Sequence, residues 1–390
     1  MNQRFQSLDA FRGATVAFMI LVNNAGNWDF IYSPLEHASW HGCTPTDLVF
    51  PFFLFAVGNS MAFVMPKLET AGQSAFLKKI ISRSLIIFGI GLFLNWFPFV
   101  RWEDDHLQFR NWVDPLHPDH GVRILGVLQR IALCYLFASL IIYYFKIRGA
   151  FVVSAILLLG YWVLCFSFGN SQAPYSLSGY FGTAIDKNIL GEAHLYRGEH
   201  VAFDPEGLAS TLPAIVQVIF GYFAGHYILQ KGKTYEMLSR LLITGCVLVF
   251  VGYCWDMVFP INKKIWTSSF VVYTSGLAML ILGVTMDLVE FKQIKGFLLL
   301  SFTAFGKNPL FIYVLSGFIP RLLTLIRWRE GIGEDGKPAY TTPLPWFYEH
   351  VCRPVSDNLK NGSLLYALCV VGFFWLIALW MDRRKIYIRV

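Results

Sequence analysis

The stretch EHASWHGCTPTDLVFPFFLFAVGNS, residues 36–60, places two histidines and an aspartate directly before an almost unbroken apolar run. A helix needs about 20 apolar residues to cross the hydrocarbon core of a bilayer. We predict such a span at residues 47–65. The titratable groups then gather at the mouth of a membrane helix, which requires an explanation.

The composition extends this interpretation to the whole chain. The 390 residues are 55% hydrophobic and 15% charged, and the mean hydropathy is +0.50. A soluble chain of this length would bury one or two cores and spread charge over its surface. We therefore expect an integral membrane protein.

Apolar runs of similar length recur from end to end. They predict an all-α fold, a polytopic transmembrane helical bundle of about ten spans, with nine to eleven as the range. Gly306 and Pro309 can break the ninth run into two half-helices. We expect residues 1–390 to form a single domain. The predicted spans are 9–24, 47–65, 80–98, 124–145, 150–169, 210–229, 238–258, 268–287, 297–319 and 363–381.

The loops alternate in charge, which predicts their orientation. Short cytoplasmic loops retain Lys and Arg. Loops 25–46 and 99–123 hold many of the acids, and 25–46 has no Lys or Arg. Both termini are then expected to be cytoplasmic. The net charge of +7 comes from basic cytoplasmic loops that lie beside the membrane surface, so we expect no nucleic-acid partner. The basic loops contain Lys78 and Lys79, Lys146 and Arg148, Lys231 and Lys233, Lys292 and Lys295, and Arg383 and Arg384.

The seven cysteines show no CxxC spacing, and most lie in or beside apolar runs as small core residues. Cys43 and Cys352 fall in predicted outer loops, where pairing and free thiols both remain open. The first residues lack the features of a cleavable signal peptide, so we expect the first span to stay in the membrane.

Polar residues that enter apolar spans are the candidates for chemistry. His37 and His41 are four residues apart, and Asp47 opens the second span, where a carboxylate is a natural helix cap. Asn23 ends the first span and can either cap it or serve a site. No metal is expected, because two histidines and an aspartate lack further ligands and no HExxH motif is present.

A series of short motifs then occurs in a characteristic order: LDAFRG, VNN, HASW, T-x-x-DLVFPFFLF, GVLQR, HLY, AFDPEG, INKKIW and GKNPLFIYV. In this order the chain resembles the heparan-α-glucosaminide N-acetyltransferase family of transmembrane acetyltransferases over nearly its whole length. Each motif is short, but their number and order make a chance match implausible.

The resemblance implies a single transmembrane acyltransferase domain that takes acetyl-CoA, a co-substrate, from the cytosol. It implies delivery of the acetyl group across the membrane to the amine of a terminal glucosamine or related amino sugar. By motif, the family's site histidine becomes His37, the asparagine before it becomes Asn23, and the neighbouring aspartate becomes Asp47.

Two departures from the animal lysosomal enzyme stand out. We see no large lumenal domain before LDAFRG, and the segment between VNN and HASW is longer than the family pattern. The chain is more similar to compact bacterial members, so we expect a bacterial inner membrane with a periplasmic outer face. A glycan or amino-sugar substrate, membrane lipid and a homodimer are the partners this resemblance allows.

The chemistry suits histidine, because an amine that attacks a thioester must lose a proton and a histidine titrates near neutral pH. His37 can act as that base or can itself carry the acetyl group in a relay, and both routes remain open. Asn23 can donate a hydrogen bond to the developing oxyanion. Asp47 can orient the imidazole and fix its tautomer.

Further residues are candidates for binding the two substrates. For CoA phosphates these are Lys78, Lys79, Arg83 and Arg240, although positive-inside anchoring explains them equally well. For the sugar they are Trp40, Asp204, Glu206, Asn262 and Asn308, although an outer tryptophan can also belong to the interfacial belt.

A function from another class competes with the enzyme. A bundle with Asn, Gln and Arg inside its spans could carry an amino sugar as a permease without acyl transfer. Acetyl-CoA separates the two functions, because an enzyme consumes it and a permease ignores it.

Overall fold

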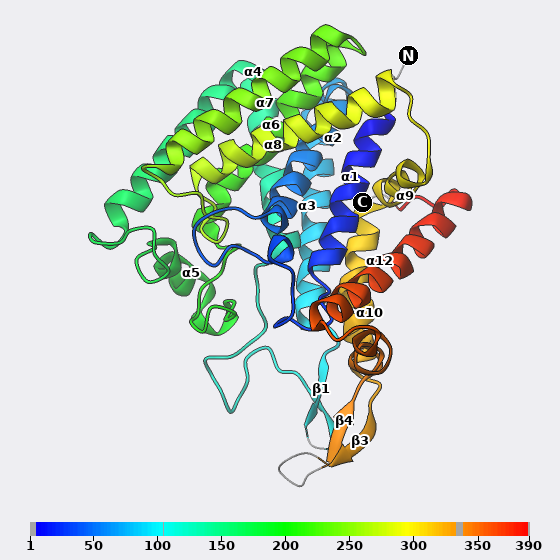
Figure 1. Ribbon diagram of the computed structural model, residues 1–390. Helices are drawn as coiled ribbons and strands as arrows, with labels where there is room; N and C mark the ends of the chain where they lie inside the picture. The colour runs from blue at the N-terminus through cyan, green and yellow to red at the C-terminus, as the bar shows by residue number, and fades with distance from the viewer. Residues whose placement is uncertain (1–4, 104, 333–337, 389–390) are drawn as a thin grey trace.

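The computed structural model describes residues 5–103, 105–332 and 338–388. The chain is mostly helical, with two short antiparallel hairpins outside the bundle (Figure 1). The helices are α1 (Gln6–Val22), α2 (Val49–Thr70), α3 (Gln73–Trp96), α4 (Val127–Phe168), α5 (Gly182–Leu190), α6 (Leu208–Lys231), α7 (Tyr235–Asp256), α8 (Ser268–Met286), α9 (Phe297–Lys307), α10 (Pro309–Leu323), α11 (Pro343–Phe347) and α12 (Leu359–Arg383).

The ten predicted spans all fall on these helices, with one difference in connection. The fourth and fifth runs form one element, α4, which is kinked at Lys146. Lys146 has φ 54°, a left-handed conformation that costs a non-glycine residue energy. The predicted loop is therefore reduced to a non-helical break at Lys146, where two helical segments meet.

The break predicted in the ninth run is confirmed. Helices α9 and α10 meet at Asn308 and are bent by 83° relative to each other. Pro309 occupies the first position of α10, where its missing N–H needs no partner. The apolar run is therefore a broken helix.

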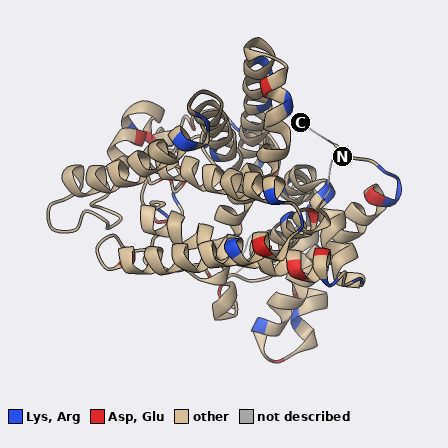
Figure 2. Cartoon of the chain, turned by 90° about the horizontal axis from the view of Figure 1, so that it is seen from above, with Lys and Arg blue, Asp and Glu red and all other residues tan. Residues whose placement is uncertain are grey.

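Six helices of the described residues are long and apolar enough to cross a membrane, and the number is seven if the bent pair forms one span. These six include α4, which at 42 residues has the length for two crossings. Helix α1 has only 17 residues, and α3 carries Lys78, Lys79 and Arg83. A count of ten requires α1 and α3 to cross and α4 to cross twice, so it stays a prediction, as does the orientation of the termini. Figure 2 shows long stretches of helix without charged residues, as an integral membrane protein requires.

Small residues bring the central helices into backbone contact. A Cβ built on Gly306 of α9 would lie 1.8 Å from the carbonyl oxygen of Asp9 on α1. A Cβ on Gly58 of α2 would lie equally close, 1.8 Å, to the carbonyl oxygen of Val218 on α6. In a bilayer such close packing replaces the hydrophobic effect as the force between helices.

The hairpins were not predicted from the sequence. Strand β1 (Val100–Glu103) pairs with β2 (His106–Phe109), and β3 (Trp328–Ile332) pairs with β4 (Pro338–Thr341). Figure 1 places both at the end of the bundle opposite the N-terminus. They extend the end at which α1 finishes and α2 begins.

Candidate active site

The loop before α2 is built around the carboxylate of Asp47. Asp47 sits in the 3₁₀ turn η2 (Pro45–Leu48), and its Oδ2 accepts hydrogen bonds from the backbone N–H groups of Thr44 and Ala38, both at 3.0 Å. The side chain is 2% exposed. Thr44 and Asp47 form a capping box, so the capping interpretation of Asp47 holds. The cap also fixes the other carboxylate oxygen.

That second oxygen contacts His37. The Nδ1 atom of His37 lies 2.7 Å from Oδ1 of Asp47, and the His37 side chain is 43% exposed. A buried carboxylate at this distance assigns the Nδ1 proton and leaves the Nε2 lone pair for a reactant. The sequence-predicted pair is thus brought together in the geometry of an oriented base.

Lys263 completes the cluster and was not predicted. Its Nζ lies 3.0 Å from Nδ1 of His37 and 3.3 Å from Oδ1 of Asp47. Burial lowers the pKa of Lys263, and the carboxylate of Asp47 opposes that effect. One signal could have revealed it: Lys263 and Lys264 are cations in a predicted outer loop, against the positive-inside pattern.

These groups line one cavity of about 430 Å³, which we call the histidine cavity. Asn23, the C-terminal cap of α1, also lines it, and so do Trp40 and Glu206. Asn23 also lines a neighbouring cavity of about 380 Å³ with Asn24, Asn95 and Gln129. The histidine cavity further includes Arg123, Val127, Ile131, Tyr196, Glu199, Lys264, Trp266 and Tyr313.

An ion-pair network forms one wall. Arg123 donates to Asp204 at 2.9 Å and 2.6 Å, and it also contacts the carboxylate of Glu206. Burial would lower the pKa of Arg123, but Glu206 and Asp204 outweigh it and hold that pKa above its ordinary value. Asp204 is 1% exposed and serves Arg123, while Glu206 reaches the cavity.

The remaining predicted sugar ligands differ in position. Asn262 is fully buried and accepts a hydrogen bond from Ile265 N–H at 3.0 Å, so it shapes the turn that presents Lys263. Its Nδ2 lies 3.3 Å from Nδ1 of His41, and neither Asn262 nor His41 lines the histidine cavity. Burial lowers the pKa of His41.

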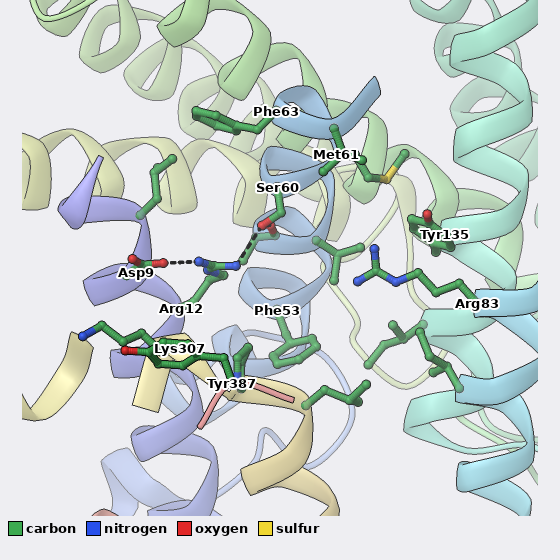
Figure 3. Close-up of a pocket in the computed structure, with 18 of the residues that line it drawn as sticks. Asp9, Arg12, Phe53, Ser60, Met61, Phe63, Arg83, Tyr135, Lys307 and Tyr387 are labelled. Carbon is green, nitrogen blue, oxygen red and sulfur yellow. Dashed lines mark hydrogen bonds and ion pairs between the residues drawn. The ribbon is translucent and has the colours of Figure 1, made fainter. Parts of the chain in front are cut away.

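A larger cavity of about 660 Å³ is lined by the beginnings of α1 and α4, by α2 and by α3 (Figure 3). We call it the basic cavity, because Arg12, Lys79, Arg83 and Lys307 line it. Arg12 contacts Asp9 and lies 3.3 Å from Ser60 Oγ, and Lys307 lies 2.7 Å from Asp382. Arg83 approaches from the opposite side in Figure 3, over the ring of Tyr135.

The predicted phosphate ligands therefore separate. Lys79 and Arg83 line the basic cavity, whereas Lys78 and Arg240 do not. Arg240 is 63% exposed and pairs with Glu236 on the same helix at 3.0 Å. Asn308 lies near this cavity and not near the histidine: its Nδ2 donates to the carbonyl of Ile386 at 2.9 Å.

The two cavities meet inside the bundle. Phe53 of α2 and Ile131 of α4 line both of them. Along α2 the basic cavity extends from Val64 to Phe53, which at 1.5 Å per residue is about 16 Å. Phe53 and Ile131 thus form an apolar septum between the basic cavity and the histidine cavity.

Cys43 and Cys352 both carry free thiols, which answers the question that the sequence left open. Burial raises the pKa of Cys43 to about 12, so it is a poor nucleophile. Within the described residues, no group of three or more His, Cys, Asp or Glu side chains could hold a metal ion.

Comparison with known proteins gives consistent matches. A profile described as heparan-alpha-glucosaminide N-acetyltransferase, catalytic, matches residues 4–253. The human protein named heparan-alpha-glucosaminide N-acetyltransferase is 29% identical over 449 aligned positions, covering 99% of this chain and 60% of the human protein. The mouse protein of that name is 28% identical over 438 positions, covering 96% and 60%. The chain thus spans about 60% of the length of these curated relatives.

Proposed function

The chain belongs to the heparan-alpha-glucosaminide N-acetyltransferase family, and on that basis we propose that it transfers an acetyl group from acetyl-CoA to the amine of a glucosamine or related amino sugar. The observation that carries the proposal is the contact of His37 with Asp47 in a cavity that an apolar septum divides from a basic one. Such a pair of cavities suits two substrates that enter from opposite sides of a membrane.

The donor would occupy the basic cavity. CoA carries phosphates, and Lys79 and Arg83 supply cations that no described carboxylate pairs with. The Nε atoms of Arg12 and Arg83 are buried without a hydrogen-bond partner in the described chain. With phosphates at Lys79 and Arg83, the thioester would lie toward Phe53 and Ile131.

The acceptor would occupy the histidine cavity. Glu206 and Glu199 can attract a glucosaminium or accept hydrogen bonds from hydroxyl groups, and the Trp40 ring offers an apolar face to a pyranose. Trp40 is fixed for that task, because its indole N–H donates to the carbonyl of Tyr175 at 2.8 Å. Asp204 acts through Arg123, which it holds in place.

The residues of the site then perform acyl transfer. In direct transfer the amine nitrogen bonds to the acetyl carbon, Nε2 of His37 takes the amine proton, the carbon–sulfur bond breaks, and the proton leaves with the CoA thiolate. Asp47 stabilises the transient imidazolium, and Asn23 donates to the carbonyl oxygen as charge develops there. In a relay, the Nε2 lone pair bonds to the acetyl carbon as the carbon–sulfur bond breaks and CoA leaves as the thiolate. The sugar amine then bonds to that carbon as the Nε2–carbon bond breaks, and Nε2 takes the amine proton.

We place the basic cavity on the cytosolic side and the histidine cavity on the outer side, which is periplasmic if the host membrane is a bacterial inner membrane. The loop charges support this orientation, since Lys78 and Lys79 lie at the basic end and loop 25–46 at the histidine end lacks Lys and Arg. Acetyl-CoA is a cytosolic metabolite, which agrees with the same orientation.

Purified protein in nanodiscs, incubated with isotope-labelled acetyl-CoA and a panel of amino sugars and glucosamine-terminated oligosaccharides, tests the proposal. Mass spectrometry should find an N-acetylated product and free CoA, and both should disappear for His37→Ala. A chain that neither binds nor consumes acetyl-CoA, yet moves an amino sugar across a vesicle membrane, would instead be the permease.

A further inference from the structure

Lys263 makes two contacts that one neutral histidine cannot satisfy together. Nδ1 of His37 lies 2.7 Å from an acceptor, Asp47 Oδ1, and 3.0 Å from a donor, Lys263 Nζ. Nδ1 can donate a proton to the first or accept one from the second. The shorter, charge-assisted contact with Asp47 takes the Nδ1 proton, so Lys263 interacts chiefly with the carboxylate.

We propose that Lys263 is a positioning residue: its ammonium offsets the charge of Asp47 and thereby keeps His37 neutral, with the Nε2 lone pair available for acyl transfer. The inference rests on the proposed function, because it assigns Lys263 a task in the same reaction. With this cation beside it, Asp47 can orient the imidazole ring of His37 without holding His37 in the protonated state, in which it could not act as a base.

Electrostatics supports these separate roles, in which Asp47 orients His37 and Lys263 offsets the charge of Asp47. An isolated buried carboxylate in contact with an imidazole favours the imidazolium, which cannot act as a base. Asp47 is 2% exposed, so solvent does little to screen it. A cation 3.3 Å from the same oxygen removes most of that bias. Lys263 also disfavours a second positive charge 3.0 Å away on His37.

The burial of Lys263 itself points to a purpose. Its side chain is 23% exposed, and burial lowers the pKa of its ammonium. Asp47 is the strongest of the groups that oppose the effect of burial, followed by Glu206. A lysine that only needed to be solvated would not occupy this place between a carboxylate and a histidine.

The other charged groups around the cavity do not replace Lys263. Lys264 pairs with Glu199 at 2.7 Å, and Arg123 is taken by Asp204 and Glu206. Cys43 stays a thiol, and His41 faces Asn262. These groups therefore leave one carboxylate in excess, and loss of Lys263 would make the surroundings of His37 more negative still.

Modification of the whole 390-residue chain by diethyl pyrocarbonate tests the inference without using acyl transfer. The reagent modifies neutral imidazole, and fragment spectra separate His37 from His41 in one peptide. Between pH 5 and 9, the midpoint of the His37 modification rate should rise by about one pH unit or more in Lys263→Met. The ascending limb of the pH profile of turnover should move by the same amount, with activity recovering at high pH.

Two variants serve as matched controls. Lys263→Arg keeps the charge and should keep the wild-type midpoint. Lys264→Met removes a charge from the same cavity that pairs with Glu199 and not with Asp47, and it should shift the midpoint by less than Lys263→Met. If Lys263→Met does not fold, Lys263→Gln takes its place.

The outcomes are distinct. An unchanged midpoint in Lys263→Met, with turnover reduced equally at every pH, overturns the inference and leaves Lys263 a structural residue. A shifted midpoint in a protein that never consumes acetyl-CoA supports the role of Lys263 and refutes the proposed function instead.

Discussion

Phe53 of α2 and Ile131 of α4 are the two side chains shared by the basic cavity and the histidine cavity. Any acyl group that passes from one to the other must pass this pair. We therefore expect Phe53 and Ile131 to limit the size of the acyl group that can be transferred, in addition to separating the two substrates.

Substitution at Phe53 should change acyl preference. Phe53→Ala removes the whole ring, so the ratio of propionyl to acetyl transfer should rise, by about 10-fold if one extra methylene is accommodated. Phe53→Trp should slow acetyl transfer without weakening CoA binding. Competition between acetyl-CoA and propionyl-CoA gives the ratio directly. Phe63→Ala, which lines only the basic cavity, is the control, and an equal change there would refute this limit on acyl size.

His37 should dominate catalysis over its neighbour in the sequence. His37→Ala should lower kcat/KM by 10² to 10⁴, about 3 to 5 kcal/mol of transition-state stabilisation, with the thermal unfolding midpoint retained. His41→Ala should cost far less, since His41 does not line the cavity. Asn23→Ala should fall between them, because water can partly replace an amide donor. Full activity in His37→Ala, with loss in His41→Ala, would reverse the assignment.

Arg83 and Arg240 provide a matched pair for the donor site. Arg83→Ala should raise the Kd for CoA by about 10-fold to 100-fold, the usual effect of losing a hydrogen bond to a charged group. Arg240→Ala should leave it unchanged, since Arg240 is 63% exposed and pairs with Glu236 outside the cavity. Equilibrium binding of CoA to the purified protein measures both. Equal effects of the two substitutions would remove the basic cavity as the donor site.

Helix packing at Gly306 should tolerate no side chain. Gly306→Ala places a Cβ 1.8 Å from the carbonyl oxygen of Asp9, so α1 and α9 must separate. We expect a loss of about 1 to 3 kcal/mol or more, seen as a lower unfolding midpoint in detergent. Gly89→Ala and Gly372→Ala, where nothing lies within 4 Å of the added Cβ, should be neutral. Equal loss in all three would contradict the packing argument.

Asp186 should make stability depend on pH in mild acid. Burial raises its pKa to about 6, from an ordinary value of about 4. The folded state thus binds this proton more tightly than the unfolded state, and the group's contribution to stability falls as pH rises from about 4 to about 6, by on the order of 2 to 3 kcal/mol. Asp186→Asn should abolish this component of the pH dependence. A wild-type melting profile that differs from Asp186→Asn by a constant at every pH would show that Asp186 does not titrate there.

The sequence predicted the helices well because apolar length is a local property. Runs such as 47–65 and 210–229 need no knowledge of their neighbours to be identified as membrane helices. The interruption near Lys146 was predicted as a loop and is instead a kink, because two basic residues between apolar runs look the same in both. The hairpins were missed because their pairing depends on loops that have no strong alternation.

The site was predictable where a motif held its residues close in sequence. His37 and Asp47 are ten positions apart, and the structure joins them. Lys263 lies 226 positions from His37, and no local pattern connects residues so distant. The predictions for Arg240 and Asn308 failed for a different reason. A charge or a motif places a residue on a helix but does not show which cavity its side chain faces.

The amide of Asn308 at the helix break makes the last residues of the chain a reporter of what fills the basic cavity. Its Oδ1 accepts from the backbone N–H of Ile388 at 2.8 Å, and Ile388 itself lines that cavity. A ligand that displaces Ile388 would make this hydrogen bond open more often, and a ligand that packs against Ile388 and holds it in place would make it open less often. Deuterium uptake at the backbone N–H of Ile388 would therefore follow the binding of a ligand in the basic cavity over time, without a dye or a substitution in the site.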